Sequence, residues 1–384
     1  MKLSIFAATL LAGLAASCAP AYESSVKSSR AQGARDHYET EILNSDLAKS
    51  REYQAWVAEG RRALRDGLSI RPSFKEVVFF SGDDPTAVGY RLDLRRGQRL
   101  RVQMSRSGNT RIFAELFEQI GAADPIYRLV HSANPGKSEF SFEAHSDGIH
   151  VLRLQPEMMK GAEVAITLST AAGLTFPVQG KNSNAIRSFF GDSRDGGKRD
   201  HEGIDIFAAR GTTVFAVADG VISEVGINKL GGKVVWQYDA ERNVTYYYAH
   251  LNSQSVREGD RVSAGSTIGT VGNTGNARTT SPHLHFAVYR PGRVAIDPVP
   301  FIFDAPGDVV APVLVDLTRL GVWTETVKPT TLHASPAKNS RVLAEVPAHT
   351  RMRVVSGVRE WHRVQLDNGR RGFIPGQVSI LGMQ

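Results

Sequence analysis

The sequence contains one cysteine in 384 residues, which excludes an internal disulfide and any metal site built from several cysteines. After the first twenty residues it has no long apolar run. The net charge is +7, from 46 Lys plus Arg against 39 Asp plus Glu. This charge favours polyanionic surroundings but does not identify the polyanion. A chain of this length and ordinary composition predicts two or three domains with separate cores.

The N-terminus has the pattern of an export signal. Lys2 precedes an apolar stretch from Leu3 to Ala16, which is too short to span a bilayer. The small residues before Cys18 resemble a bacterial lipobox, which implies a lipoprotein signal peptide at residues 1–18 and lipid chains on Cys18. The absence of Asp at position 19 resembles the sorting pattern of Gram-negative outer-membrane lipoproteins.

These features predict an exported protein held by a lipid anchor at the periplasmic face of the outer membrane. The alternative is a soluble secreted protein that is cut just beyond Ala19. Export argues against nucleic acid as a partner. The two alternatives differ at Cys18, because the lipid-anchored protein keeps this cysteine and the soluble secreted protein loses it on cleavage.

The overall pattern is mainly β, and the first two segments after the signal differ in periodicity. Residues 19–70 are polar, with apolar residues near the helical period, and predict a tether followed by one helix. Residues 71–172 change to period two and predict an antiparallel β-sandwich. The Arg-rich stretch from Arg91 to Arg111 alternates with apolar residues, as a solvated strand face does. The sandwich resembles the pre-peptidase accessory domains of secreted bacterial proteases.

Two further segments predict short strands joined by tight turns. Residues 176–305 are rich in glycine and valine, which predicts a Gly-rich β-sheet domain. Residues 322–384 resemble a bacterial Src-homology-3-like (SH3-like) module over some fifty residues, from Thr331 to Ile374. That resemblance implies a small barrel that binds or positions the protein at the cell wall. The alternative is a barrel that only packs on its neighbour, because a fold does not specify a ligand.

Histidines gather in the Gly-rich segment, in three short motifs. His201 and Asp205 stand four residues apart in a turn that enters a strand, and His283 and His285 alternate on a predicted strand, so their imidazoles project from one face. His250 ends a run of aromatic and β-branched residues and is expected at the end of a strand. His131, His145 and His150, in the sandwich segment, lack partners at ligand spacing and receive no role.

Two imidazoles and one carboxylate around zinc leave a fourth position for water, which is the arrangement of a hydrolytic site. Zinc lowers the pKa of that water and polarises a scissile carbonyl. The five positions, in this order and with Gly-rich spacers, resemble the lysostaphin-type, LytM-like zinc endopeptidases over roughly 125 residues of the chain.

The resemblance implies one Zn²⁺ per chain, with His201, Asp205 and His285 as ligands, and His250 and His283 as a catalytic pair that does not bind the metal. An imidazole with a pKa near 6.5 accepts or donates a proton near neutral pH, so either histidine can serve as base or as partner of the oxyanion. We favour His283 as the base and His250 as the partner of the oxyanion, because His283 shares a strand face with the ligand His285. Ser281, where the family commonly has glycine, leaves the shape of the substrate loop open.

The resemblance further implies an endopeptidase that hydrolyses peptide cross-links of peptidoglycan, with the bond from D-alanine to diaminopimelate expected in a Gram-negative host. Peptidoglycan and the membrane are the expected partners, and wall-synthesis or division proteins are candidates. The alternatives are a catalytically silent or latent regulator of wall amidases and a general secreted protease. Regulators of this kind usually lack one or more ligands, whereas all five positions are present in this chain.

Overall fold

The computed structural model describes residues 33–303, 310–376 and 380–382. The predicted signal peptide at residues 1–18, Cys18 and the start of the predicted tether lie outside the described residues. Within the described ranges, no helix is long and apolar enough to cross a membrane. The predicted mainly β fold is confirmed, because strands make up most of the regular structure. The predicted domain boundaries remain predictions.

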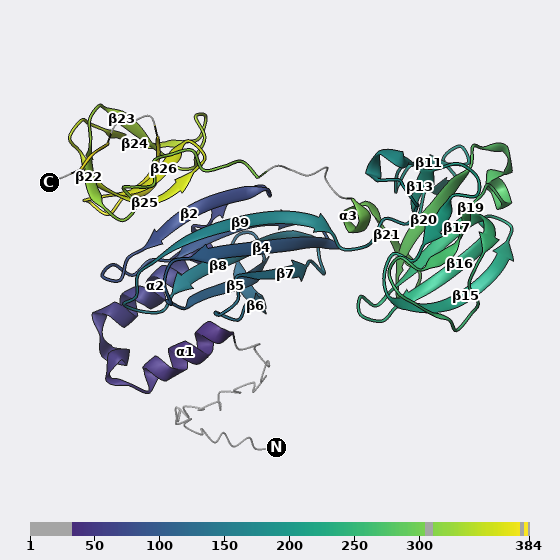
Figure 1. The fold of residues 1–384 in the computed structure, drawn as a ribbon, viewed down its shortest axis with the longest axis horizontal. Helices are drawn as coiled ribbons and strands as arrows, with labels where there is room; N and C mark the ends of the chain where they lie inside the picture. Colours follow the sequence, from purple (N-terminus) through teal and green to yellow (C-terminus); the bar gives the residue numbers. More distant parts are fainter. Residues whose placement is uncertain (1–32, 304–309, 377–379, 383–384) are drawn as a thin grey trace, which may run out of the picture. The chain divides into compact units, whose positions relative to one another are not determined.

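The N-terminal region contains two helices where one was expected. Helix α1 (Ala34–Leu43) and helix α2 (Arg51–Arg65) are separated by the 3-10 turn η1 (Asp46–Lys49). The break has a local cause, because Ser50 is extended and its side chain accepts a hydrogen bond from the backbone of Tyr53, which starts α2 as an N-cap. Buried Trp56 of α2 donates its indole N–H to the carbonyl of Pro156, which fixes α2 on the sheet that contains β5 and β8 (Figure 1).

The predicted sandwich consists of two sheets around one core. The first has the order β1-β3-β8-β5-β6 and is antiparallel except for the β1–β3 pair. Its strands are β1 (Leu68–Ser69), β3 (Val88–Leu94), β5 (Ile112–Ile120), β6 (Ile126–Ser132) and β8 (Gly148–Pro156). The second sheet includes β2 (Phe74–Phe80), β4 (Gln98–Arg106), β7 (Glu139–Glu143) and β9 (Ala162–Ala172). Leu92, Leu94, Leu100 and Val102 are fully buried between the sheets, so the Arg-rich stretch is the other face of two strands, as predicted.

The C-terminal strands continue the second sheet, and among the described residues they show no pairing that closes a separate barrel. Strand β25 pairs with β26 on one side, and on the other side it pairs with β22 and, beyond it, with β2. The strands are β22 (Trp323–Thr326), β23 (Thr330–His333), β24 (Val342–Val346), β25 (Arg351–Val358), β26 (Trp361–Leu366), β27 (Arg371–Pro375) and β28 (Ile380–Gly382).

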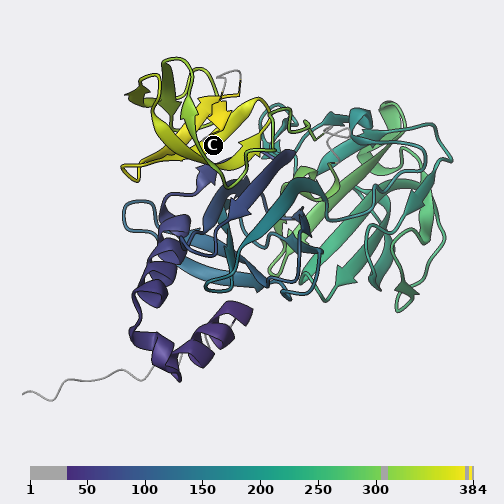
Figure 2. The ribbon, with the colours of Figure 1, turned by 60° about the vertical axis from the view of Figure 1, so that its left-hand side comes forward.

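No pairing among the described residues closes these strands into the barrel that the SH3-like pattern predicted, because β25 uses part of its outer edge for β2. Figure 2 shows these strands, in yellow, beside the end of β2.

The Gly-rich segment forms a ten-stranded sheet whose main order is β10-β13-β20-β17-β16-β15-β18 (Figure 1). The strands are β10 (Ile186–Ser188), β13 (Ile204–Phe207), β14 (Thr213–Phe215), β15 (Gly220–Asn228), β16 (Gly232–Asp239), β17 (Val244–Gln254), β18 (Arg261–Val262), β19 (Thr267–Val271), β20 (His283–Arg290) and β21 (Val294–Ile296). The hairpin of β11 (Ser193–Arg194) and β12 (Arg199–Asp200), the 3-10 turns η2 (Ser183–Ala185) and η3 (Gly275–Thr279), and helix α3 (Val299–Ile302) complete the segment.

One face of this sheet packs into a large core that includes Tyr246, Tyr248, Leu284 and Phe286. Side chains on alternate positions of the same strands therefore project to the opposite face. That opposite face carries the histidines of the predicted metal site.

Candidate metal centre

Strand pairing brings two of the predicted ligands into direct register. Asp205 of β13 and His285 of β20 are Cα partners in an antiparallel pair. His201 precedes β13, in a turn, and its imidazole contacts both of them. Leu284 is fully buried in the core beneath, which leaves His283 and His285 on the other face, as the alternation along a strand requires. The predicted turn into a strand at residues 201–205 is confirmed, and so is the predicted strand from His283.

Three atoms able to bind a metal form a nearly equilateral triangle. His201 Nε2 lies 3.1 Å from Asp205 Oδ1 and 3.0 Å from His285 Nδ1, and His285 Nδ1 lies 3.1 Å from Asp205 Oδ1. A tetrahedral zinc ion with bonds of about 2.0–2.2 Å separates its ligand atoms by about 3.3–3.6 Å. Small outward movements therefore give the spacing that zinc needs, and two imidazoles with one carboxylate fit a catalytic site. It is the one such cluster of three or more ligand residues in the part of the chain that the structure describes.

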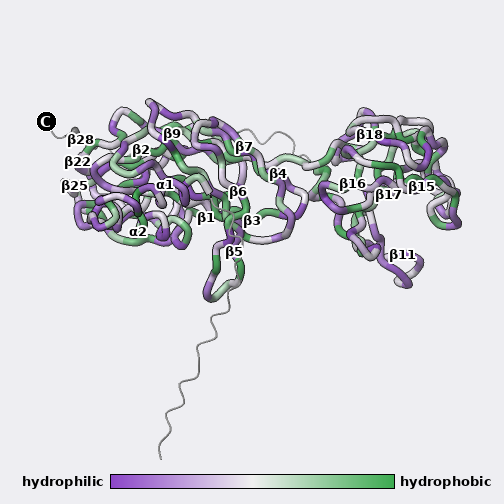
Figure 3. The backbone as a smooth tube through the Cα atoms, turned by 90° about the horizontal axis from the view of Figure 1, so that it is seen from below, coloured by the Kyte–Doolittle hydropathy of each residue, from purple (hydrophilic) through white to green (hydrophobic). Residues whose placement is uncertain are grey.

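Neighbouring groups orient two of these side chains. His201 Nδ1 lies 2.8 Å from the carbonyl oxygen of Phe189, and a metal at Nε2 requires the tautomer in which Nδ1 donates to that oxygen. Arg194 donates from Nη2 to Asp205 Oδ2 over 2.7 Å, so the second carboxylate oxygen is held by a guanidinium. Arg194 belongs to the β11–β12 hairpin, which Figure 3 colours as hydrophilic.

The second pair of histidines also faces this centre. The ring of His283 lies 5.0 Å from that of His250, and the ring of His250 lies 5.8 Å from that of His285, between centroids. The Nδ1 atom of His250 lies 2.9 Å from the carbonyl oxygen of Thr274, and that of His283 lies 2.8 Å from the carbonyl oxygen of Ser281. Donation to these carbonyls leaves each Nε2 as an acceptor. The structure thus brings all five predicted positions together.

His250 does not end its strand, contrary to the prediction. Strand β17 continues to Gln254, and its register with β16 shifts next to His250. The φ angle of His250 is 60°, in the left-handed region that a side chain other than glycine rarely adopts. The bulge, which pattern reading of the sequence cannot locate, therefore places this imidazole without ending the strand.

Burial and neighbouring charges shift the titration of the centre in opposite directions. Burial would raise the pKa of Asp205, but the neighbouring imidazoles of His201 and His285 outweigh it and hold the pKa of this carboxyl well below its usual range. Burial, reinforced by repulsion from His285 and His283, lowers the pKa of His250 to about 4. The carboxylate is therefore ionised at pH 7, which is the form that a metal ligand requires, and the imidazole of His250 is neutral.

A cavity of about 570 Å³ surrounds the histidines and has an aromatic wall. Trp236, Tyr247 and Tyr289 line it, with the rings of Trp236 and Tyr247 4.2 Å apart and the hydroxyl of Tyr289 donating to Glu202 over 2.9 Å. Sequence reasoning missed these residues and Arg194. For Tyr247 the signal was its place between Tyr246 and Tyr248 of the core, which assigns it to the opposite face of the strand.

Comparison with known proteins identifies the segment that holds this centre. Residues 199–298 match the model of peptidase family M23. This segment belongs to peptidase family M23. The chain is 37% identical, over 138 residues, to an L-Ala–D-Glu endopeptidase of Bacillus subtilis, a match that covers 33% of this chain and 42% of that protein. It is 41% identical, over 86 residues, to the peptidoglycan DD-endopeptidase ShyC of Vibrio cholerae, covering 22% of this chain and 19% of that protein.

Among solved structures, the chain is similar to the catalytic domain of lysostaphin from Staphylococcus simulans, with 34% identity and a TM-score of 0.28. That likeness covers 30% of this chain and 90% of the lysostaphin domain. The chain spans less than half the length of the two curated relatives above. The similarity to those relatives is therefore a similarity of the M23 segment and not of whole proteins.

Proposed function

We propose that this protein is a zinc-dependent endopeptidase that hydrolyses peptide cross-links of peptidoglycan. The observation that carries the proposal is the triangle of His201 Nε2, Asp205 Oδ1 and His285 Nδ1, faced by two further imidazoles in one cavity. The two curated relatives described above are, by name, endopeptidases, and one is named for peptidoglycan. These names support peptidoglycan as the substrate class, and the bond from D-alanine to diaminopimelate stays a prediction.

In this proposal, the metal ion and the residues of the chain have different roles in hydrolysis. Zinc in this site supplies a Lewis acid, which polarises a carbonyl and increases the acidity of water. Asp205, held ionised by its neighbours, and the two ligand imidazoles provide the donor atoms. Arg194 fixes the orientation of the Asp205 carboxylate through its second oxygen. These residues keep the donor atoms in place before substrate arrives, which lowers the reorganisation that catalysis requires.

In this proposal, His250 and His283 accept and donate the proton. Each ring donates from Nδ1 to a backbone carbonyl, so each has an unprotonated Nε2 in its neutral form. A neutral Nε2 accepts a proton from water, and the resulting imidazolium donates to a developing oxyanion or a leaving amine. Because both rings have the same tautomer, the assignment of His283 as base and His250 as oxyanion partner stays a prediction that rests on the shared strand face of His283 and His285.

Digestion of purified sacculi tests the proposal. Zinc-loaded protein is expected to release muropeptides whose cross-links have been cut, and His201→Ala is expected to abolish the release because one ligand is lost. His37→Ala is the matched control, since His37 is exposed on α1 and far in sequence from the M23 segment. Mass analysis of the released peptides identifies the bond.

Two outcomes contradict the proposal. Release that survives His201→Ala would assign the activity to something other than this metal site. Absence of release with zinc and with other divalent metals would favour the alternative of a silent or latent regulator of wall amidases. In that case the protein would be expected to stimulate a purified amidase on the same sacculi.

We also propose export and lipid anchoring at the periplasmic face of the outer membrane, supported by residues 2–18 of the sequence alone. Metabolic labelling with palmitate in cells that produce the protein is expected to mark it, and Cys18→Ala is expected to remove the mark. A label that persists in Cys18→Ala, or no label on the unaltered chain, would leave the soluble secreted form as the better account.

A further inference from the structure

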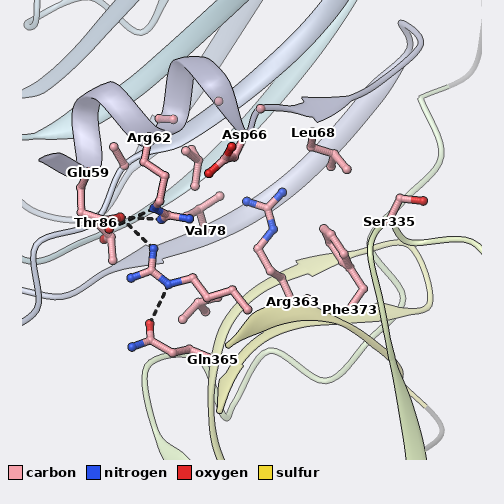
Figure 4. A pocket seen from close by; sticks show the side chains of 18 of the residues that line it. Glu59, Arg62, Asp66, Leu68, Val78, Thr86, Ser335, Arg363, Gln365 and Phe373 are labelled. Carbon is pink, nitrogen blue, oxygen red and sulfur yellow. Dashed lines mark hydrogen bonds and ion pairs between the residues drawn. The ribbon is translucent and has the colours of Figure 1, made fainter. Parts of the chain in front are cut away.

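A second cavity lies between the sandwich and the C-terminal strands, and it contains no residue of the metal centre. Its volume is about 710 Å³, and its walls come from α2, β2, β3, β26 and β27. This volume is within the range of about 300–1,000 Å³ that is common for small-ligand sites. Figure 4 shows side chains from the helix and from both groups of strands converging on it.

Hydrogen bonds tie the two sides of this cavity together. Arg371 of β27 donates from Nη1 to Glu59 Oε2 of α2 over 2.7 Å, and Ser356 of β25 donates to the buried carboxylate of Glu76 on β2. The backbone pairing of β2 with β25 runs beside them. These contacts therefore join the two sides of the cavity.

Arg363 contributes a guanidinium to this cavity. Its side chain is 14% exposed, extends from β26 and points toward α2 (Figure 4). Its Nε pairs with Glu76 Oε1 at 3.4 Å without a hydrogen bond, its guanidinium carbon lies 4.9 Å from the centre of the Phe373 ring, and no hydrogen bond of its side chain is found within the described residues. A guanidinium has five N–H donors, and leaving donors unsatisfied in a largely buried place is costly. A planar acceptor that takes two parallel N–H groups satisfies this group best.

The other charges around the cavity limit the ligand to a single negative charge. Glu59 is already paired with Arg62 and Arg371, and Glu76 faces Arg363. Asp66 adds an exposed carboxylate to the lining. A phosphate or sulfate dianion would meet the carboxylates of Glu59 and Asp66 in the lining, whereas a carboxylate matches the fork of Arg363 with less repulsion.

The remaining lining fits a short peptide with small side chains. Leu68, Val78 and Phe373 provide apolar surface, and several alanines and glycines leave space between them. The hydroxyl of Thr86 also lines the cavity, is buried and has no hydrogen-bond partner among the described residues. A peptide offers amide groups to this hydroxyl, aliphatic groups to the apolar surface and a terminal carboxylate to the guanidinium.

We propose that this cavity is a second binding site, which takes the free carboxylate end of a short peptide with small aliphatic side chains on Arg363. The site goes beyond the proposed hydrolysis, because a bound chain end there is not cleaved. Such ends occur in wall peptides, which terminate in D-residues, and in proteins, which terminate in L-residues. Arg363 would bind the terminal carboxylate of either kind of peptide. The configuration of the terminal residue, D or L, distinguishes wall peptides from protein termini.

Calorimetric titration of the full chain in detergent, with the metal removed by a chelator, tests the proposal. The probes are acetyl-D-alanyl-D-alanine, acetyl-L-alanyl-L-alanine and the C-terminal amide of each. At least one acid is expected to bind, with its amide at least about tenfold weaker because the charge-assisted pair is lost. Preference for the D-acid assigns the site to wall peptides, and preference for the L-acid assigns it to protein termini. This comparison uses the unaltered protein and does not depend on any variant folding.

Two variants then test whether the peptide binds at Arg363. Arg363→Gln is expected to weaken binding of the acid at least about tenfold, and to bind acid and amide alike. Arg370→Gln, the same change at an exposed arginine of the neighbouring turn, is expected to bind as the unaltered chain does. Equal binding of acid and amide, no binding of either acid, or unchanged binding by Arg363→Gln would each overturn the proposal. Sacculus digestion by the same samples is independent, so failure here does not decide the proposed hydrolysis.

Discussion

A single methyl group added at Gly203 is expected to disable the metal centre without changing any ligand. A Cβ atom there would lie 2.5 Å from the carbonyl oxygen of Phe286, 2.9 Å from His285 Cε1 and 3.0 Å from Ala287 Cβ. Ordinary contacts begin at 3.4 Å, so β20 would have to retreat by about 0.9 Å from the carbonyl contact alone. Strand β20 is paired with β13 and β17 on its two sides, so it cannot move without breaking that pairing.

We therefore expect Gly203→Ala to displace His285 and to weaken zinc binding about 10–100-fold, as loss of a supporting contact does. Overpacking is expected to lower the free energy of unfolding by about 1–3 kcal/mol. Competition with a chromophoric chelator measures the zinc affinity, and urea unfolding of the metal-free protein measures the stability. Gly226→Ala is the matched control, because its Cβ would meet only Glu224 Oε1 at 3.6 Å. Zinc affinity and sacculus digestion that match the unaltered chain would refute the steric argument.

Three further substitutions follow from the same structure. Gly89→Ala should loosen α2 and lower the urea midpoint, because its Cβ would lie 1.8 Å from the carbonyl oxygen of Ala63; an unchanged midpoint would contradict this packing. Arg194→Met should weaken zinc binding about 10–100-fold in the chelator assay, since the second oxygen of Asp205 loses its partner; unchanged affinity would show that the carboxylate needs no support. Burial lowers the pKa of His150 in the folded state, so unfolding takes up protons below the ordinary pKa near 6.5. Stability should then fall as pH drops from 7.5 to 5.5, and less so in His150→Gln; equal slopes would remove His150 as a cause.

The metal centre could be predicted from the sequence because strand geometry fixes it over short distances. Residues that stand two apart on a strand project from the same face. This rule predicted that His283 and His285 share a face and that Leu284 faces the core. The turn from His201 into the strand of Asp205 is equally local. These inferences needed no knowledge of which strands pair. The pairing of β13 with β20 then brought the two motifs into contact.

The supporting residues could not be predicted in the same way, because their roles depend on contacts between distant segments. Arg194 is one arginine among many in the sequence, and only the fold places it against Asp205. The position of His250 depends on a bulge in the middle of β17, and a bulge breaks the period-two pattern from which strands are read. Ser50, which divides the expected single helix, is a polar residue that the helical periodicity of its neighbours obscured.

The missing barrel closure and the second cavity have one structural cause. A closed barrel of the C-terminal strands would have kept the outer edge of β25 for its own strands, whereas β2 of the sandwich takes part of that edge. The shared edge places Ser356 and Arg363 against Glu76, a fully buried carboxylate of the sandwich. The C-terminal strands thus supply the charge that makes burial of Glu76 tolerable. The same arrangement brings Arg363 to the lining of the cavity, so the C-terminal strands contribute to the proposed site together with the sandwich, and their predicted binding to the cell wall stays a prediction.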